Sequence, residues 1–225
     1  MKKSYPSLIN DVEEYITNVV DDIDVNKYKK CIIFGNGPSL LTKTVDVKDS
    51  FVCRTNWFFL EEKPRFGTRV DAYFYSIYNQ EMLKQLSESC YQIRRHFRPF
   101  NIFTSPTNNE YLYEGDVYNV INHWVILSKY PEIAKQMIKR PLPTQGVQMI
   151  LTMAALGFVN IETYGIDFYK NLDKRYCYEQ NERSIKALQT KDITPGYEKD
   201  HSFEKDKKLV SLAKILFPKT DIRIM

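Results

Sequence analysis

The residues best suited to do chemistry begin with a glycine-containing turn, Gly35-Asn36-Gly37, between a short apolar run and a predicted helix start at Ser39. Glycines let backbone N–H groups approach a ligand closely, and a helix N-terminus presents the positive end of its dipole to an anion. The turn therefore predicts a site for a nucleotide or another phosphate-bearing ligand. It is not the dinucleotide fingerprint, because Leu40 occupies the third glycine position, and no P-loop Gly-Lys-Ser/Thr follows. For a glycine pair alone, an ordinary strand-to-helix turn is the better interpretation.

Further polar side chains occur after a second predicted strand and in a polar segment near the C-terminus. Arg54 and Asn56 fall where the carboxyl end of a strand meets a ligand crevice, although Asn56 also suits an Asx turn. Residues 170–203 are polar, contain several tyrosines and have few aliphatic side chains, which is typical of a functional lid or a disordered loop. His201 lies in this segment, where a core role is not expected, whereas surface or core roles suit His96 and His123.

The elements that position these residues are predicted from apolar runs and helical spacing. Strands are predicted over 31–34, 51–54, 70–75, 100–104, 117–121, 159–164 and 221–225. Helices are predicted over 7–22, 79–97, 131–139, 147–155 and 204–217, with Gly157 ending the fourth. Alternation of strands and helices indicates an α/β fold with a parallel sheet and ligands at the carboxyl ends of its strands. We expect an accessory helix in residues 1–29, one domain over 30–225, and a lid at about 168–203.

Composition and charge narrow the class of protein. The 225 residues are 43% hydrophobic and 14% aromatic, far from a disordered composition, and a net charge of +4 is a weak argument for nucleic acid. The four cysteines lack metal-type spacing, which favours buried thiols in a reducing compartment. No signal peptide and no run long enough to cross a bilayer is found. The sequence therefore predicts a cytoplasmic protein.

Several motifs in order along residues 30–225 resemble the family 42 bacterial sialyltransferases of the lipooligosaccharide type. The most specific is Gly-Ile-Asp-Phe-Tyr at 165–169, whereas pterin pyrophosphokinase-like and flagellin-modifying relatives share the Gly-Asn-Gly-Pro-Ser-Leu turn. The other motifs are Arg54-x-Asn56, Phe74-Tyr75, Thr144-x-Gly146, Ala-Leu-Gly157 and His201-Ser202. The resemblance implies a Rossmann-like, GT-A-like fold without Asp-x-Asp, and inverting, metal-independent transfer from CMP-sialic acid. It also implies a lid, a homo-oligomer, commonly a tetramer, and loose attachment to the inner membrane.

The resemblance assigns site residues wherever this sequence matches the family's motifs. The donor-binding set that it implies is Gly35, Asn36, Gly37, Arg54, Asn56, Asn79, Thr144, Gln145 and Gly146. Asn79 stands one residue later than in the family, and Gln145 replaces a serine that receives the sialic acid carboxylate. Tyr169 and Tyr176 would bind the leaving phosphate, with one inserted residue before Tyr176. His201 matches the general base, and Leu142 stands in place of a family arginine, with Arg140 nearby.

The chemistry of these residues is consistent with that reaction. Tyrosine hydroxyls and a glycine-turn amide would stabilise the leaving phosphate, and the loss of one such donor typically costs about 3 kcal/mol. A histidine is largely neutral near pH 7 and can accept a proton from the acceptor hydroxyl. No metal or other cofactor is needed if hydroxyl groups bind the phosphate. Asp22-Ile23-Asp24 matches Asp-x-Asp but precedes the first predicted strand, so we interpret it as a helix end with surface acids.

Two other functions remain open on the sequence. A nucleotide-sugar or pyrophosphokinase-like enzyme could use the same glycine turn, and it would require a metal ion and a nucleotide other than CMP. A non-catalytic nucleotide-sugar-binding module is the second alternative. It is disfavoured because a sensor does not need a histidine in a tyrosine-rich lid. The expected partners are CMP-sialic acid and a glycan or glycolipid acceptor, and nucleic acid is not expected. We also expect peripheral membrane contact and a homo-oligomeric state.

Overall fold

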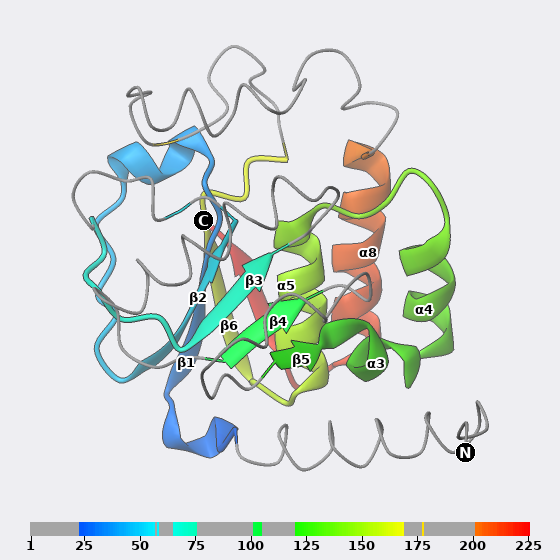
Figure 1. Ribbon diagram of the computed structural model, residues 1–225, viewed down its shortest axis with the longest axis horizontal. Coiled ribbons are helices and arrows are strands. Elements are labelled where there is room, and N and C mark those ends of the chain that lie inside the picture. Colours follow the sequence, from blue (N-terminus) through cyan, green and yellow to red (C-terminus); the bar gives the residue numbers. More distant parts are fainter. Residues whose placement is uncertain are drawn as a thin grey trace, which may run out of the picture.

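The computed structural model describes residues 23–56, 58, 65–75, 101–104, 120–168, 177 and 201–225. Within them the chain forms a seven-stranded sheet of parallel strands in the order β5-β4-β3-β2-β1-β6-β7 (Figure 1). The strands are β1 (Lys30–Phe34), β2 (Ser50–Thr55), β3 (Ala72–Tyr75), β4 (Asn101–Thr104), β5 (Val120–Asn122), β6 (Asn160–Tyr164) and β7 (Asp221–Ile224). This confirms the α/β class with a parallel sheet.

The centre of the sheet is built from strands that are apolar on both faces. All six residues of β2 are buried, and so are four of the five residues of β1. Such continuous burial is what a parallel sheet covered on both faces requires. The direction of chain progression reverses at β1, because β2 to β5 extend to one side of it while β6 and β7 extend to the other. In open α/β sheets, the crevice at such a switch point is where ligands bind.

Four helices cover one face of the sheet (Figure 1). They are α3 (His123–Ser128), α4 (Pro131–Ile138), α5 (Gln145–Ala155) and α8 (Phe203–Leu216). Most of α5 is buried against the strands, and it ends where Gly157 adopts a φ of 96°, a left-handed value that glycine tolerates. The predicted stop at Gly157 is confirmed, and α4, α5 and α8 match their predicted ranges to within about two residues.

The opposite face carries a smaller apolar cluster around Ile32, Phe34, Val52, Phe66 and Tyr164. Two short 3₁₀ helices complete the described elements, η1 (Val25–Lys27) and η2 (Pro38–Thr42). No helix in the described ranges is long and apolar enough to cross a bilayer.

The sequence predictions differ from the structure at several places. The fifth strand ends at Asn122, one residue beyond the predicted 117–121, and is described from Val120, whereas α3 was not predicted. The element after Gly37 is a five-residue 3₁₀ helix, and its N-cap is Gly37 rather than Ser39. The predicted helices at 7–22 and 79–97 and most of the predicted lid lie outside the described residues.

Candidate active site

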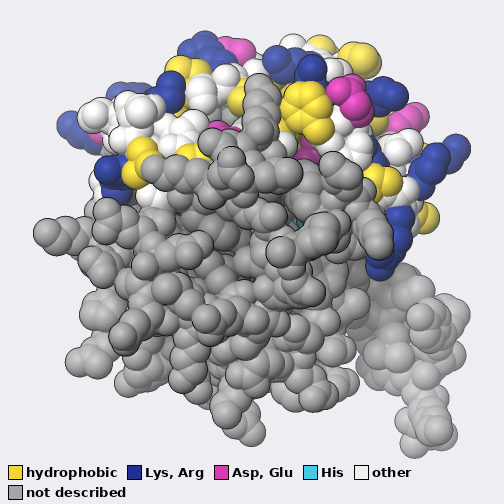
Figure 2. Space-filling model, turned by 90° about the horizontal axis from the view of Figure 1, so that it is seen from above, with side chains coloured by type: hydrophobic (Ala, Val, Ile, Leu, Met, Phe, Trp, Pro, Cys, Tyr) yellow, Lys and Arg dark blue, Asp and Glu magenta, His cyan; other side chains and the backbone are white. Residues whose placement is uncertain are grey.

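The predicted site residues that the structure describes gather at the carboxyl edge of the sheet. Three turns meet there, after β1, β2 and β6, because parallel strands end at the same edge. The start of α5 reaches the same place, since the Cα of Gly146 lies close to the Ile166 side chain, where an added Cβ would be 3.1 Å from Cδ1. Figure 2 views the molecule from above and shows Lys and Arg side chains spread over the described part of this surface.

The glycine turn is shaped by contact with the turn after β6. The N–H groups of Gly35 and Gly37 donate to the carbonyl oxygens of Tyr164 and Gly165, at 2.8 and 2.9 Å. A Cβ on Gly35 would lie 2.2 Å from the Gly165 oxygen, and one on Gly37 would lie 2.4 Å from Asp167 Oδ2. Close packing of two backbone turns therefore explains both glycines. The expectation that their N–H groups are directed at a ligand is wrong for these two amides.

The start of η2 is closed by a side chain of this protein. Asp167 accepts hydrogen bonds from the Ser39 N–H, at 2.9 Å, and from the Ser39 hydroxyl. The anion expected at this helix start is thus the carboxylate of Asp167, which belongs to the protein itself. The helix, η2, is also only five residues long. This arrangement agrees with the expectation that Asp167 organises a turn rather than performs chemistry.

The side-chain amide of Asn36 is buried at this edge of the sheet and held by a hydrogen bond. Its side chain is 9% exposed, and Nδ2 donates to the Thr55 carbonyl oxygen at 3.0 Å. Its Oδ1 is buried and has no hydrogen-bond partner in the described part of the chain. The Asn36 carbonyl oxygen accepts from the N–H of Cys177 at 2.8 Å. The turn thus contacts Cys177, which follows Tyr176 in the sequence.

Arg54 and Asn56 have different environments at the end of β2. The Arg54 side chain is 2% exposed, and its guanidinium carbon lies 5.2, 4.7 and 6.0 Å from the ring centres of Phe34, Phe58 and Phe66. Asn56 adopts a φ of 47°, and its N–H donates to the Phe74 carbonyl oxygen at 2.9 Å. Left-handed backbone is tolerated by asparagine, so Asn56 suits this tight turn. The contact of either residue with substrate stays a prediction.

The segment Thr144-Gln145-Gly146 begins α5, with Thr144 as its N-cap. The Thr144 hydroxyl and N–H donate to the two carboxylate oxygens of Asp206, at 2.6 and 3.1 Å. Asp206 is fully buried, and burial raises the pKa of its carboxyl group, while the Thr144 bonds and the nearby His201 and Lys205 oppose that shift. The proton of the Thr144 hydroxyl is therefore committed to Asp206.

Two glutamines one turn apart in α5 show which buried amide is unsatisfied. The Gln148 side chain donates to the Pro143 carbonyl oxygen at 2.9 Å, and its Oε1 lies 2.9 Å from His123 Nε2. Gln145 is 8% exposed, yet neither atom of its amide has a hydrogen-bond partner among the described residues. A buried polar group without a partner is costly and is usually explained by a water molecule or a ligand. Gln145 is therefore a strong candidate for a ligand contact.

His201 is oriented by the chain that precedes α5. Its Nδ1 lies 2.8 Å from the Leu142 carbonyl oxygen, which can only accept, so Nδ1 carries the hydrogen of this bond. In the neutral imidazole, Nε2 then holds the lone pair, as a general base requires. The rings of Phe168 and Phe203 pack edge to face, with centres 5.8 Å apart. The chain just before Tyr169 thus contacts the chain just after His201.

Some predicted residues lie outside the described part of the chain, namely Tyr169, Tyr176 and Asn79. Conversely, sequence reasoning did not find Asp206 or Lys205, which contact the same segment as His201. A signal for Asp206 existed, because it shares the buried stripe of α8 with Leu209 and Ala213. A carboxylate at a core position normally has a specific partner. In the described ranges, no cluster of three His, Cys, Asp or Glu side chains could hold a metal ion.

Comparison with known proteins gives matches over most of the chain. The family model of the alpha-2,3-sialyltransferase CST-I matches residues 29–217. The crystal structure of monofunctional alpha-2,3-sialyltransferase Cst-I from Campylobacter jejuni is 27% identical, with 88% of this chain and 75% of that one covered and a TM-score of 0.66. No curated protein matches the chain.

Two further crystal structures share the fold at lower identity. CstII from Campylobacter jejuni, in complex with the substrate analogue CMP-3FNeuAc, is 22% identical, with 87% of this chain and 81% of that one covered and a TM-score of 0.64. CST-II in complex with a trisaccharide acceptor and CMP is 21% identical, with 87% and 80% covered and a TM-score of 0.60.

Proposed function

The chain belongs to the CST-I alpha-2,3-sialyltransferase family of CMP-sialic acid-dependent enzymes, and from this premise we propose an inverting, metal-independent transfer of sialic acid to a sugar hydroxyl. The proposed acceptor is a terminal galactose of a bacterial surface glycan. The trisaccharide acceptor bound to the related CST-II supports a glycan in this role. We also propose a cytoplasmic, homo-oligomeric enzyme that contacts the inner face of the membrane peripherally.

His201 is the proposed general base. As the acceptor oxygen bonds to the anomeric carbon of sialic acid, its proton passes to Nε2, and the bond from that carbon to the phosphate oxygen breaks. The electron pair of that bond leaves with CMP. The Leu142 carbonyl oxygen supports this role, because it holds the hydrogen on Nδ1 and favours the tautomer with a basic Nε2. General base catalysis of this kind contributes roughly 10²- to 10⁴-fold.

The donor would lie along the glycine turn and the start of α5. Asn36, Asn56, Asn79 and Gly146 are the proposed contacts, with Arg54 behind them, and Gly35 and Gly37 shape the turn that carries Asn36. Gln145 would face the sialic acid, and Thr144 would hold Gln145 in place through Asp206. Tyr169 and Tyr176 are proposed donors to the leaving phosphate. The bond from Cys177 to Asn36 supports this arrangement, because it ties the residue after Tyr176 to the glycine turn.

The observation that carries the proposal is that two buried side-chain amides at the carboxyl edge, those of Asn36 and Gln145, lack hydrogen-bond partners among the described residues. Within this part of the chain, Asn36 lacks one partner, and Gln145 lacks both. Asn36 Oδ1 and both amide atoms of Gln145 are shielded from water without a partner among the described residues. Both residues lie in segments that the family resemblance assigns to the donor. A nucleotide sugar carries many hydroxyl, amide and amino groups, so it could satisfy these atoms.

A titration calorimetry series with a transfer assay tests the proposal. The purified protein is titrated with CMP, CTP, UDP and GDP, with and without EDTA, and is then assayed for transfer from labelled CMP-sialic acid to terminal galactosides and sialosides. We expect CMP to bind equally with EDTA, UDP not to bind, and a galactoside to be labelled. The His201→Ala variant should lose transfer by at least about a hundredfold while it binds CMP normally.

Other outcomes would identify the alternative functions. Metal-dependent binding of CTP or GDP, without transfer, would indicate a pyrophosphokinase-like enzyme. CMP binding without transfer to any acceptor would indicate a binding module. Near-native transfer by His201→Ala would show that another group is the base.

A further inference from the structure

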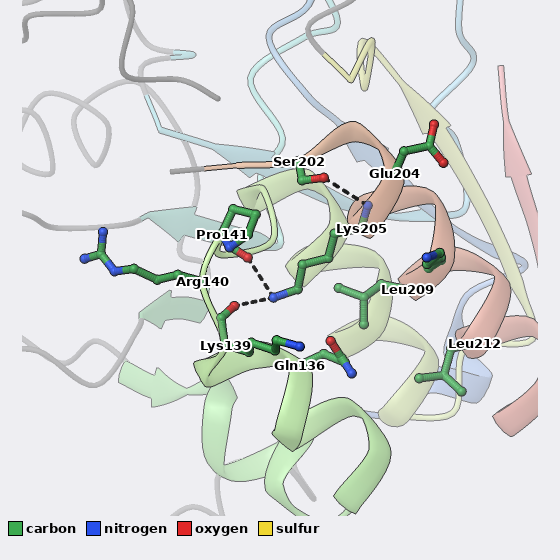
Figure 3. Close-up of a pocket in the computed structure, with 10 residues that line it drawn as sticks. Gln136, Lys139, Arg140, Pro141, Ser202, Glu204, Lys205, Leu209 and Leu212 are labelled. Carbon is green, nitrogen blue, oxygen red and sulfur yellow. Dashed lines mark hydrogen bonds between the residues drawn. The ribbon is translucent and has the colours of Figure 1, made fainter. Parts of the chain in front are cut away.

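The connector between α4 and α5, residues 139–144, is bonded to His201 and to the first turn of α8. Lys205 Nζ donates to the carbonyl oxygen of Pro141 at 2.7 Å and to that of Lys139. His201 Nδ1 bonds to the Leu142 carbonyl oxygen at 2.8 Å. Figure 3 shows the Lys205 side chain crossing from α8 to the connector, with dashed lines to both carbonyl oxygens. The base and Lys205 therefore bind neighbouring peptide groups of one short segment.

The second half of the connector is held by the next residue of α8. Asp206 accepts two hydrogen bonds from Thr144, one from the N–H and one from the hydroxyl. Thr144 directly precedes Gln145, the amide that lacks a partner in the described part of the chain. Lys205 and Asp206 are adjacent in sequence and contact opposite ends of the connector. One rigid helical turn thus positions both the segment behind the base and the segment that enters the donor site.

The Lys205 ammonium group is not in a setting typical of a surface lysine. It lies at a groove of about 450 Å³ between α4, the connector and α8 (Figure 3). Leu209 and Leu212 of α8 also line this groove. Burial lowers its pKa, with a smaller contribution from Lys139, while Asp206 opposes the shift. Its hydrogen bonds go to two carbonyl oxygens rather than to a carboxylate. Hydrogen bonds to a charged donor are stronger than neutral ones, so Lys205 is a firm anchor for the connector.

We propose that Lys205 and Asp206 are positioning residues of the transfer reaction: Lys205 fixes the peptide segment whose next carbonyl group, that of Leu142, orients His201, and Asp206 fixes the segment that presents Gln145. The inference rests on the proposed function of His201 and Gln145. Misplacement of a reacting group by about 1 Å can cost a hundredfold in rate, so loss of such an anchor should be visible in turnover. The two anchors should affect different kinetic parameters, because they act on different groups.

The test of Lys205 compares three variants in the full-length protein. Lys205→Met removes the donor, Lys205→Arg retains a charged donor, and Lys208→Met is the matched control. Lys208 lines the same groove and has no hydrogen bond to the connector. We expect Lys205→Met to lower kcat by about tenfold to a hundredfold with donor KM little changed, whereas Lys205→Arg recovers most of the loss and Lys208→Met resembles the wild type.

A readout independent of activity is the tautomer of His201, measured by long-range ¹⁵N–¹H NMR at a pH where the imidazole is neutral. The chain has three histidines, so assignment through His201→Ala is practical. Lys205→Met should increase the population with hydrogen on Nε2, and Lys208→Met should not. If Lys205→Met lowers only the melting temperature and leaves both kcat and the tautomer at control values, the positioning role is wrong. If the wild type transfers no sialic acid, the proposed function is wrong, and the NMR result still decides the role of Lys205.

The test of Asp206 uses Asp206→Asn with Thr144→Val as a second variant, so that the result does not depend on one substitution at a fully buried position. Both changes remove the bond between the Thr144 hydroxyl and a carboxylate. We expect donor KM to rise by about tenfold or more, as for loss of one buried hydrogen-bonded contact, with a smaller change in kcat. Thr144→Ser, which keeps the hydroxyl, should recover most of the loss seen in Thr144→Val. Unchanged donor KM in Thr144→Val would overturn the role of Asp206.

Discussion

At the scale of single residues, the candidate site is distinguished by how its buried amides are satisfied. Gln148 and Gln145 lie one turn apart in α5, yet the first has partners at both ends of its amide and the second has none among the described residues. Asn36 is intermediate, because its nitrogen is bonded to the Thr55 carbonyl oxygen and its oxygen has no partner in the part of the chain that the structure describes. The unsatisfied amide atoms of Asn36 and Gln145 lie at the carboxyl edge of the sheet, where a parallel α/β fold binds its ligands.

Replacement of Asn36 by alanine should weaken nucleotide binding more than it weakens the fold. The fixed Oδ1 is ready to accept a hydrogen bond from CMP, and loss of one such bond costs about 1–2 kcal/mol, so we expect CMP affinity to fall by about five- to thirtyfold in calorimetry. Asn160→Ala is the matched control, since its amide also donates to a backbone carbonyl oxygen, that of Lys29, at 3.2 Å and at the other end of the sheet. Equal CMP affinity in both variants would remove Asn36 from the donor site.

At the scale of elements, two backbone turns are packed so closely that side chains are excluded between them. Gly35 and Gly37 contact the turn at Gly165–Asp167, and the Asp167 carboxylate in turn binds Ser39. This contact fixes the turn after β1 relative to the turn after β6, on either side of the switch point of the sheet. The geometry of Asn36 is therefore a consequence of how these two turns pack.

A Gly37→Ala variant should be destabilised by steric contact alone. Gly37 has a φ of −72°, which any residue adopts, but a Cβ there would lie 2.4 Å from Asp167 Oδ2 and 2.7 Å from the Gly165 oxygen. We expect the free energy of unfolding in urea to fall by about 1–3 kcal/mol, as for overpacking in a core. Part of this cost should disappear in an Asp167→Ala background, because that change removes the nearest atom.

The control for Gly37 is Gly67→Ala. Gly67 has a φ of 75° and no atom of the described residues within 4 Å of an added Cβ, so its cost is strain of the backbone, about 1–2 kcal/mol. This cost should be the same with and without Asp167. Additive effects for Gly37→Ala and Asp167→Ala would mean that the turn shifts to relieve the contact.

The elements were predictable where a local pattern determines them. The apolar runs of β1 and β2 and the helical spacing of α8 needed no knowledge of the rest of the chain, and so their ranges agree with the structure. The six-residue α3 was missed because it is too short to show a helical period. The reason for Gly35 and Gly37 was also missed, because their neighbours are about 130 residues away in the sequence.

The site was predictable only in part for the same physical reason. The resemblance identified His201, Gln145 and Asn36 as candidates, but His201 and Asn36 are held by backbone carbonyl groups, which have no signature in the sequence. Leu142 orients His201 through its carbonyl oxygen, so the identity of its side chain carries no information about that bond. Lys205 binds two further carbonyl oxygens of the same segment, and only the folded chain brings these groups together.

At the scale of the whole molecule, one ion-pair group joins the strands on both sides of the switch point. Glu162 on β6 pairs with Lys30 on β1 at 2.8 Å and lies 4.0 Å from Arg223 on β7. The Tyr164 hydroxyl donates to the same carboxylate at 3.0 Å. The side chain of Glu162 is 17% exposed, so this group is less screened than a pair on the open surface. It links three neighbouring strands of the sheet that carries the site.

This ion-pair group should give the protein an acid-sensitive component of stability. Burial raises the pKa of Glu162, but the bonds to Lys30 and Tyr164 and the charges of Lys30 and Arg223 outweigh it, so the pKa lies below its usual value. The unfolded chain then binds the proton more tightly than the folded chain, and unfolding becomes easier as the pH falls. The stabilisation is complete above the ordinary pKa of glutamate and is lost as the pH falls through the lower folded value. In Glu162→Gln, the free energy of unfolding measured by urea titration should therefore change less between pH 7 and acid than in the wild type.

Salt separates this effect from ordinary surface charge. Asp49 pairs with Lys29 at 3.1 Å, but the two side chains are 47% and 81% exposed, so Asp49→Asn serves as the control. The hydrogen bond and charge of Lys29 lower the pKa of Asp49, and its acid-sensitive contribution should largely vanish in high salt. The contribution of Glu162 should persist there, because its partners and its partial burial limit access of ions. If high salt abolishes the Glu162 effect as fully as that of Asp49, the group joining β1, β6 and β7 acts as surface charge and does not stabilise the centre of the sheet.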